Sequence, residues 1–131
     1  MQETSQVKSQ AQLSETAIHI NIVTWFGYNY PKYADDLIHI ANERKTSWNQ
    51  GKILKKMGVK RGVPDLFLAI PTEAYGGLWL EIKKPNGKLS KEQKEFLERK
   101  NKIGYAAHCV YSIDEAKKII ADYMQWVEYL R

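Results

Sequence analysis

Two carboxylates and a lysine occur where two short apolar runs of the sequence can lie side by side. Asp65 opens the run 65–70, and Glu81 and Lys83 close the run 78–83. A proline and two adjacent glycines lie between the runs, which predicts two strands joined by a turn. Successive side chains of a strand point to opposite faces, so the three charged residues share one face. The other face of this hairpin is aliphatic and consists of Leu66, Leu68, Ile70, Leu78, Leu80 and Ile82.

The three charged residues are of the types that handle phosphate esters with a metal ion. A hairpin folded symmetrically about its turn places Asp65 opposite Lys83 and diagonal to Glu81. Diagonal neighbours are about 7–8 Å apart at the backbone, so the two carboxylates could converge on one cation. Mg²⁺ commonly takes one or two carboxylates plus water and phosphate oxygens, and it acidifies bound water. Lys83 could orient that water and stabilise the developing negative charge.

A simpler interpretation is that Glu81 and Lys83 form the solvated side of a half-buried strand. An isolated Glu-x-Lys triplet is short and common, and for such a triplet this interpretation prevails. Pro64–Asp65 at the start of one strand, combined with Glu81 and Lys83 at the end of its partner, is a more specific pattern.

Two further polar residues lie on helical stripes that face the core. Glu15 shares a helix face with His19 and with three apolar residues, where it could join a metal site or complement the helix dipole as a first-turn acid. Gln93 points inward and follows Ser90 by three residues, which is the spacing of a capping box. For both residues the structural and the functional interpretation stay open.

Helices and strands alternate along the chain and must position these residues. The pattern predicts a single α/β domain over 14–131, with a mixed sheet flanked by helices, after a flexible leader over 1–13. The expected order is a helix from Ser14 to Tyr30–Pro31, a strand 36–41, a helix 47–57, strands 65–70 and 78–83, a helix 90–103, a strand 105–111 and a helix 114–130.

Composition narrows the class of protein. The 131 residues suit one domain, and no run is long enough to cross a bilayer. The N-terminus lacks the apolar run of a signal peptide, so a cytoplasmic protein is expected. Cys109 is the single cysteine, which excludes an internal disulfide and a cysteine-based zinc site. In its apolar run, Cys109 is interpreted as a buried, inert thiol.

Basic residues gather in two segments, although the net charge is only +5. Segment 83–102 has eight basic residues against three glutamates, and Lys84 and Lys88 lie beside the proposed site. Such clustering is typical of a polyanion binder, although lysine-rich solvated surfaces are also common. Segment 44–64 has no acidic residue and seven basic ones: Arg44, Lys45, Lys52, Lys55, Lys56, Lys60 and Arg61.

Taken together, these motifs resemble the VRR-NUC family, the virus-type replication and repair nucleases of the PD-(D/E)xK superfamily. The similarity runs from about His39 to Ala116, and the chain's small size is similar to that of the stand-alone bacteriophage members. The motifs that carry it are GVKRGVPDL at 58–66, LEIK at 80–83 and LSKEQ at 89–93.

The resemblance implies a central mixed sheet flanked by helices, and it assigns roles to residues. Mg²⁺ or Mn²⁺ would be held by Asp65, Glu81 and the backbone carbonyl of Ile82. Lys83 would match the catalytic lysine, Gln93 the glutamine that follows it, and Glu15 the glutamate of the first helix.

Outside this centre, the resemblance places His39 and Asn42 near the substrate, although a loop with a hydrogen-bonding Asn explains them equally. His19 is interpreted as structural. The family's small phage members act on branched DNA, Holliday junctions in particular, as homodimers. Candidate dimer surfaces are the stripe Tyr123, Trp126, Val127 and Leu130 and the region of Trp25 and Phe26, unless these residues close the monomer's own core.

The leading hypothesis is therefore a metal-dependent, structure-selective endonuclease that resolves branched double-stranded DNA in phage replication or recombination, within the bacterial host cell. A nicking or flap nuclease is the alternative enzyme. A non-catalytic DNA-binding module with a structural acidic pair is the alternative from another class. Metal binding at Asp65 and Glu81 separates the last hypothesis from the first two.

Overall fold

The computed structural model describes residues 13–41 and 48–130. A mixed four-stranded sheet in the order β1-β2-β3-β4 forms its centre, with β1, β2 and β3 antiparallel and β4 parallel to β3. The elements are α2 (Glu15–Asn29), a 3₁₀ helix (Pro31–Asp36), β1 (Leu37–His39), α3 (Trp48–Lys56), β2 (Leu66–Leu68), β3 (Leu78–Ile82), α4 (Lys91–Lys102), β4 (Ala106–Val110) and α5 (Ile113–Leu130).

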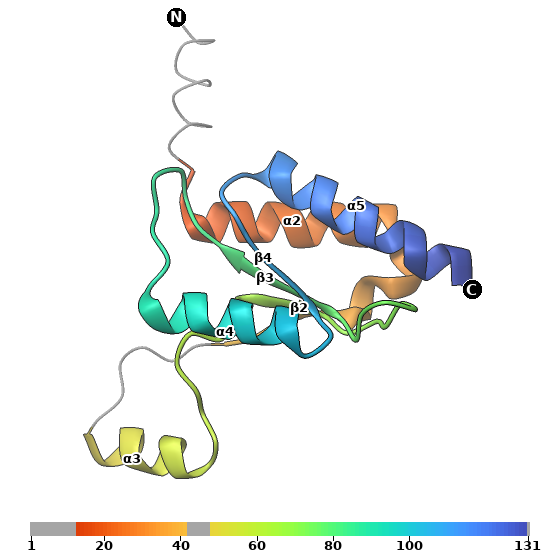
Figure 1. The fold of residues 1–131 in the computed structure, drawn as a ribbon. Helices are drawn as coiled ribbons and strands as arrows, with labels where there is room; N and C mark the ends of the chain where they lie inside the picture. Colours follow the sequence, from red (N-terminus) through yellow and green to blue (C-terminus); the bar gives the residue numbers. More distant parts are fainter. Residues whose placement is uncertain (1–12, 42–47, 131) are drawn as a thin grey trace, which may run out of the picture.

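Helices cover both faces of the sheet (Figure 1). The face toward α2 and α5 is the predicted aliphatic face, whose six hairpin side chains are all buried. Ile22 and Phe26 of α2 and Ile120 of α5 complete this core. The observed fold is thus the predicted α/β arrangement of a mixed sheet flanked by helices.

Helix α4 covers the opposite face, where an aromatic cluster packs beneath it. Phe67 of β2 stacks on Trp79 of β3 with ring centroids 4.2 Å apart, and Phe96 of α4 meets Trp79 edge-on at 5.1 Å. This face of the hairpin is therefore covered rather than solvated. Glu81 lies on it and is only 2% exposed, so the simpler interpretation of a solvated Glu-x-Lys triplet is wrong.

The register of the hairpin differs from the symmetric one expected from the sequence. Leu66 pairs with Leu80 and Leu68 with Leu78, so the next step of the ladder sets Asp65 opposite Glu81 rather than Lys83. The difference is two residues. Because side chains alternate with a period of two, a shift of two residues leaves every side chain on its expected face. The two carboxylates are direct neighbours instead of diagonal ones.

The segment after α2 and helix α5 both differ from what the sequence predicted. The 3₁₀ helix between α2 and β1 was not predicted, since Pro31 was interpreted only as a helix stop. On α5, Tyr123 and Val127 are buried, and the Tyr123 hydroxyl donates to the Ile70 carbonyl at 2.6 Å. Phe26 is also buried, so these residues close the monomer's own core and the interpretation of them as a dimer surface is wrong. Trp126 of the same stripe is exposed, and the side chain of Leu130 lies outside the described part of the chain.

Several segments lie outside the described residues, including most of the expected leader and the candidate DNA-binding residues Asn42, Arg44 and Lys45. Among the residues that are described, no helix combines the length and the hydrophobicity needed to cross a membrane.

Candidate active site

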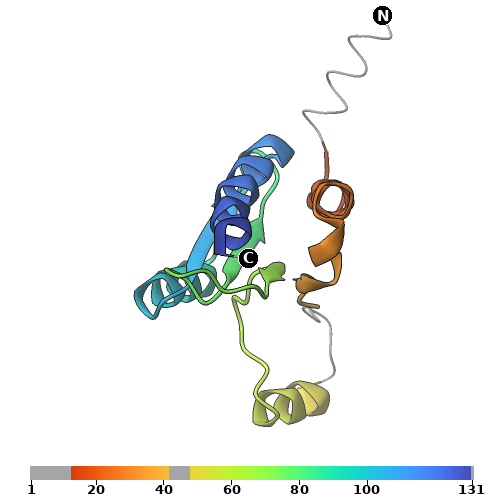
Figure 2. The same ribbon diagram turned by 90° about the vertical axis from the view of Figure 1, so that its right-hand side faces the viewer.

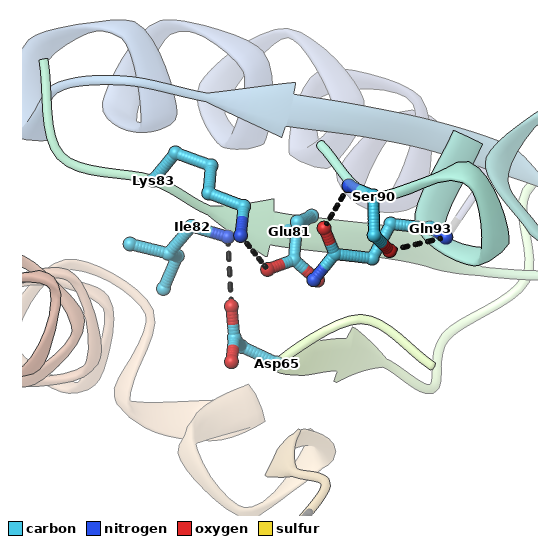
Figure 3. Close-up of polar contacts among 6 residues, drawn as sticks. All are labelled: Asp65, Glu81, Ile82, Lys83, Ser90 and Gln93. Carbon is cyan, nitrogen blue, oxygen red and sulfur yellow. Dashed lines mark hydrogen bonds and ion pairs between the residues drawn. The ribbon is translucent and has the colours of Figure 1, made fainter. Parts of the chain in front are cut away.

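The hairpin brings Asp65 and Glu81 together at the end of β3 (Figure 3). Asp65 Oδ2 accepts a hydrogen bond from the backbone N–H of Ile82 at 2.8 Å, which fixes the Asp65 carboxylate against the neighbouring strand. The Lys83 ammonium lies 3.9 Å from Glu81 Oε2, and the side chains of both residues are largely buried. The start of β2 and the end of β3 thus bring two carboxylates and a lysine side by side, although Asp65 precedes Glu81 by 16 residues in the sequence.

Burial and neighbouring charges strongly shift the pKa of Glu81. Loss of solvation raises the pKa of Glu81 to about 8, and the Asp65 carboxylate adds to this by repulsion and by a shared hydrogen bond. Lys83 acts in the opposite direction and lowers the pKa, while the charge of Glu15 raises it slightly. Without a cation, the site therefore holds its second carboxyl protonated at neutral pH. A pair that cannot carry two negative charges alone suits a divalent cation, whose charge would offset both.

The donor set fits Mg²⁺ or Mn²⁺ with few protein ligands. Hard cations prefer carboxylate and carbonyl oxygens, and Mg²⁺ is commonly held by only one or two carboxylates. Within residues 13–41 and 48–130, no group of three His, Cys, Asp or Glu side chains is arranged to hold a metal ion, so Glu15 does not complete a three-ligand cluster with Asp65 and Glu81. The carbonyl of Ile82 ends the same strand and remains a predicted third ligand.

Gln93 has the structural role that its spacing predicted. Its Oε1 accepts from the Ser90 backbone N–H at 2.8 Å, and the Ser90 hydroxyl accepts from the Gln93 N–H at 3.1 Å. This capping box starts α4 and holds Gln93 beside the site, where its amide end points toward Glu81 (Figure 3). The cap positions Gln93 without excluding a role for its amide in the reaction.

A groove of about 860 Å³ leads from this site toward α3. Lys83 and Gln93 lie in its wall together with Ser90, which joins the site to the groove. None of the described residues in the wall is acidic, and five are basic: Lys55, Lys60, Arg61, Lys83 and Lys88. Of the other predicted DNA contacts, Lys52, Lys56 and Lys84 are exposed outside this wall. The groove has the charge and the position to hold a polyanion against the carboxylate pair.

Comparison with known proteins decides the family. A model of the VRR-NUC domain matches residues 6–114. The chain belongs to the VRR-NUC family. A solved structure described as a VRR_NUC domain protein is 31% identical and superposes with a TM-score of 0.76, covering 87% of this chain and 90% of that chain. No curated protein matches the sequence. Membership implies a nuclease-type function and confirms the resemblance drawn from the motifs.

In this VRR-NUC domain, two histidines also lie beside Asp65. The ring of His39, at the end of β1, has Nδ1 3.1 Å from the backbone carbonyl oxygen of Asp65. His19 of α2 meets that ring edge-on, with centroids 4.6 Å apart. Burial and the His39 ring lower the pKa of His19, against the opposing effect of Asp65. His39 was expected near the site.

His19 was interpreted only as structural, and its closeness to Asp65 was missed. The helix face that His19 shares with Glu15 was noted in the sequence, but its consequence for the site was not drawn. His19 follows Glu15 by four residues, so both project from one side of α2 toward the same edge of the sheet.

Proposed function

We propose that this chain is a metal-dependent endonuclease that hydrolyses phosphodiester bonds in branched DNA. The observation that carries the proposal is the buried Glu81 beside the partly buried Asp65, next to Lys83, at one end of a groove lined by basic residues. A structural ion pair of Glu81 and Lys83 would not need a second carboxylate beside it, and a binding module would not need a carboxylate pair at the end of its groove. Family membership supports the nuclease-type function.

Each residue has a task that follows from its position. Asp65 and Glu81 would hold Mg²⁺ or Mn²⁺, which supplies an acidified water and neutralises charge on the phosphate. The hydrogen bond from Ile82 keeps Asp65 oriented whether or not a cation is bound. Lys83, largely shielded from solvent, donates toward oxygens that gain negative charge, where a buried cation acts more strongly than an exposed one.

Groove residues would hold the DNA backbone in register with this centre. Lys55, Lys60, Arg61 and Lys88 contact phosphates without reading bases, and Gln93 orients the attacking water. Water adds to phosphorus as the bond from phosphorus to one sugar oxygen breaks. That oxygen takes up a proton, which leaves a phosphate monoester and a free hydroxyl.

A cleavage assay tests the proposal. Four-way junction, flap and linear duplex of matched sequence are incubated with Mg²⁺, Mn²⁺ or EDTA. We expect cleavage of branched DNA with either metal, none in EDTA, and none by Asp65→Asn or Glu81→Gln. Glu98→Gln, an exposed carboxylate on α4, is the control and should cleave normally.

Other results of the same assay would reject parts of the proposal. DNA binding without cleavage by the wild-type protein, together with no Mn²⁺ binding by electron paramagnetic resonance, would indicate a non-catalytic module. Flaps cut faster than junctions would indicate a flap nuclease instead of a resolving enzyme.

We also propose that two chains act together on a four-way junction. Resolution requires two incisions in opposed strands, and one domain carries one site. A two-fold dimer would match the junction's approximate symmetry. An apolar surface suited to it lies on α2, where Ile20, Val23 and Tyr28 are 59%, 39% and 83% exposed.

Light scattering of the wild-type protein and of Ile20→Arg tests this surface. A dimer that becomes a monomer in Ile20→Arg supports it. Mixed dimers of wild-type and Glu81→Ala chains should nick a junction in one strand. A wild-type monomer that fully resolves junctions would reject the dimer.

A further inference from the structure

Helix α3 stands apart from the rest of the domain (Figures 1 and 2). No other described helix or strand packs extensively against it. Nevertheless its C-terminal end carries large apolar side chains in solvent: Ile53 in the last turn is 56% exposed, and Met57 and Val59, just beyond the helix, are 75% and 55% exposed. We call these three residues the α3 tip. Apolar groups held out on a projecting helix have no role in the core of this chain.

The α3 tip has a fixed backbone. Gly58 adopts a φ of +100°, which glycine tolerates and which ends the helix. The Gly58 N–H donates to Lys55 O at 3.1 Å, and the Val59 N–H donates to Leu54 O at 3.0 Å. These two bonds are those of a Schellman cap. The cap holds Val59 against the last turn, where Val59 and Leu54 both line the groove.

The segment after the α3 tip is anchored to the site. Gly62, with a φ of +77°, lies so close to α4 that an added Cβ would come within 2.5 Å of the Glu92 backbone and 2.8 Å of the Gln93 nitrogen. The groove then continues from Val59 to Lys83. The distance from the α3 tip to the catalytic residues is therefore set by the fold.

Positive charge surrounds the apolar surface. Between residues 48 and 64 the chain has five basic residues and no acidic one. Lys52, Lys55 and Lys56 alternate along α3 with the apolar residues, and Lys60 and Arg61 follow the α3 tip. A partner for this surface must combine negative charge with exposed apolar faces. Intact duplex DNA offers the charge, but its base faces are stacked. A branch point offers both.

We propose that the α3 tip is a wedge that packs against unstacked bases at the branch point, while the adjacent lysines hold the flanking phosphates. Small apolar wedges are a known way for proteins to unstack a base step. The proposal rests on the proposed nuclease function and names what makes the enzyme select branched DNA. Two copies of this surface would repel each other through their lysines, which argues against self-association here. An anionic lipid surface would satisfy the charge but would leave the groove toward Lys83 without a role.

The test uses single polar substitutions at exposed positions, which leave the core intact. Ile53→Ser, Met57→Ser and the double variant are compared with Ile103→Ser, whose isoleucine is 48% exposed at the end of α4. Cleavage of a three-way or four-way junction and of a linear duplex is measured for each. We expect the ratio of junction to duplex kcat/KM to fall about fivefold to tenfold in the double variant, as for loss of one modest base contact. It should stay unchanged in Ile103→Ser.

A direct readout of unstacking uses 2-aminopurine at the branch point, with EDTA present and the DNA checked for integrity. Wild-type protein should raise the 2-aminopurine fluorescence, and the double variant should not. The salt dependence of DNA binding by the double variant should nevertheless be unchanged, because every lysine remains. Unaltered cleavage ratios, or equal fluorescence with both proteins, would overturn the wedge.

Two results would show that the α3 tip binds another partner, and either one would overturn the wedge. One is a change of mass by light scattering in the Ile53 and Met57 variants. The other is tighter binding of the wild-type α3 tip to anionic vesicles than to junction DNA. Absence of DNA cleavage by the wild-type protein with any metal would instead reject the nuclease function.

Discussion

In the metal-free protein, Glu81 should make the fold less stable as the pH rises. Its pKa of about 8 in the folded state lies well above the ordinary value of 4.5. Below pH 4.5 Glu81 is protonated in both states, and its contribution to the stability of the fold is at its most favourable. Between pH 4.5 and 8 only the unfolded chain loses the proton, so the free energy of unfolding falls, and above pH 8 it levels off. Each tenfold change in an acid constant is worth about 1.4 kcal/mol, so the full loss is about 5 kcal/mol.

Glu81→Gln removes this titration while keeping the shape of the side chain. In EDTA, the variant should equal the wild type in stability near pH 4.5 and exceed it progressively up to pH 8.5, by several kcal/mol. Urea denaturation at a series of pH values measures the difference. Glu98→Gln, at an exposed position, should show no such trend.

Metal supplies the second half of this experiment. Mg²⁺ binds the deprotonated carboxylates, so it should stabilise the wild type but not Glu81→Gln. At pH 7 its binding should release close to one proton, which calorimetry in buffers of different ionisation enthalpy detects. A difference between wild type and Glu81→Gln that does not vary with pH would refute the reasoning. So would metal binding without proton release.

Three further predictions concern α4, the groove and the glycines. Gln93→Glu keeps the capping box and should change the free energy of unfolding little, whereas Gln93→Ala or Ser90→Ala should lower it by about 1 kcal/mol. If Gln93→Glu also leaves kcat unchanged, Gln93 acts only as a cap. Gly62→Ala should lower the free energy of unfolding by at least about 2 kcal/mol, because Gly62 has a left-handed backbone and lies against α4. Gly27→Ala, where an added Cβ meets nothing within 4 Å, should raise it by about 0.5–1 kcal/mol. Urea denaturation measures both, and equal effects would contradict the close approach of Gly62 to α4. Replacing Lys55, Lys56 and Lys60 by Gln should flatten the slope of log binding constant against log salt by up to about 2.7 on duplex DNA, at about 0.9 per lost contact, and an unchanged slope would place the DNA elsewhere.

The face of each strand residue could be predicted from the sequence, but the pairing of the strands could not. Alternation of aliphatic and polar residues assigned Leu66 and Leu80 to the core, as observed. The register depends on how the chain turns between the strands, and that turn is irregular: Thr72 N–H donates to Tyr75 O, and Gly76 N–H to Gly104 O. The distant segment at Gly104 thus helps to set the register of the strands. No local pattern contains that information.

Apolar stripes were equally ambiguous for a physical reason. A helix packed in a core and a helix in a dimer both show residues at three- and four-residue spacing. On α5 the stripe fills the core, since Tyr123 and Val127 are buried. On α2 apolar residues lie on two sides, with Ile22 buried and Ile20 exposed, and only the structure separates the two. The capping box at Ser90 was predictable because its hydrogen bonds depend on neighbouring residues alone.

The candidate site combines a carboxylate pair that lowers the stability of the metal-free protein with contacts that hold this pair in place. The carboxylate pair costs stability as the pH rises when no cation is present, because burial, and after it the neighbouring Asp65 carboxylate, disfavour the ionised form of Glu81. Nearby contacts hold the pair in place nonetheless: the Ile82 N–H fixes Asp65, and the α4 cap fixes Gln93 beside Glu81. Gly62 then ties the segment that follows α3 to that same cap. The start of α4 therefore positions both Gln93 beside Glu81 and the chain segment that forms the groove wall between the site and α3.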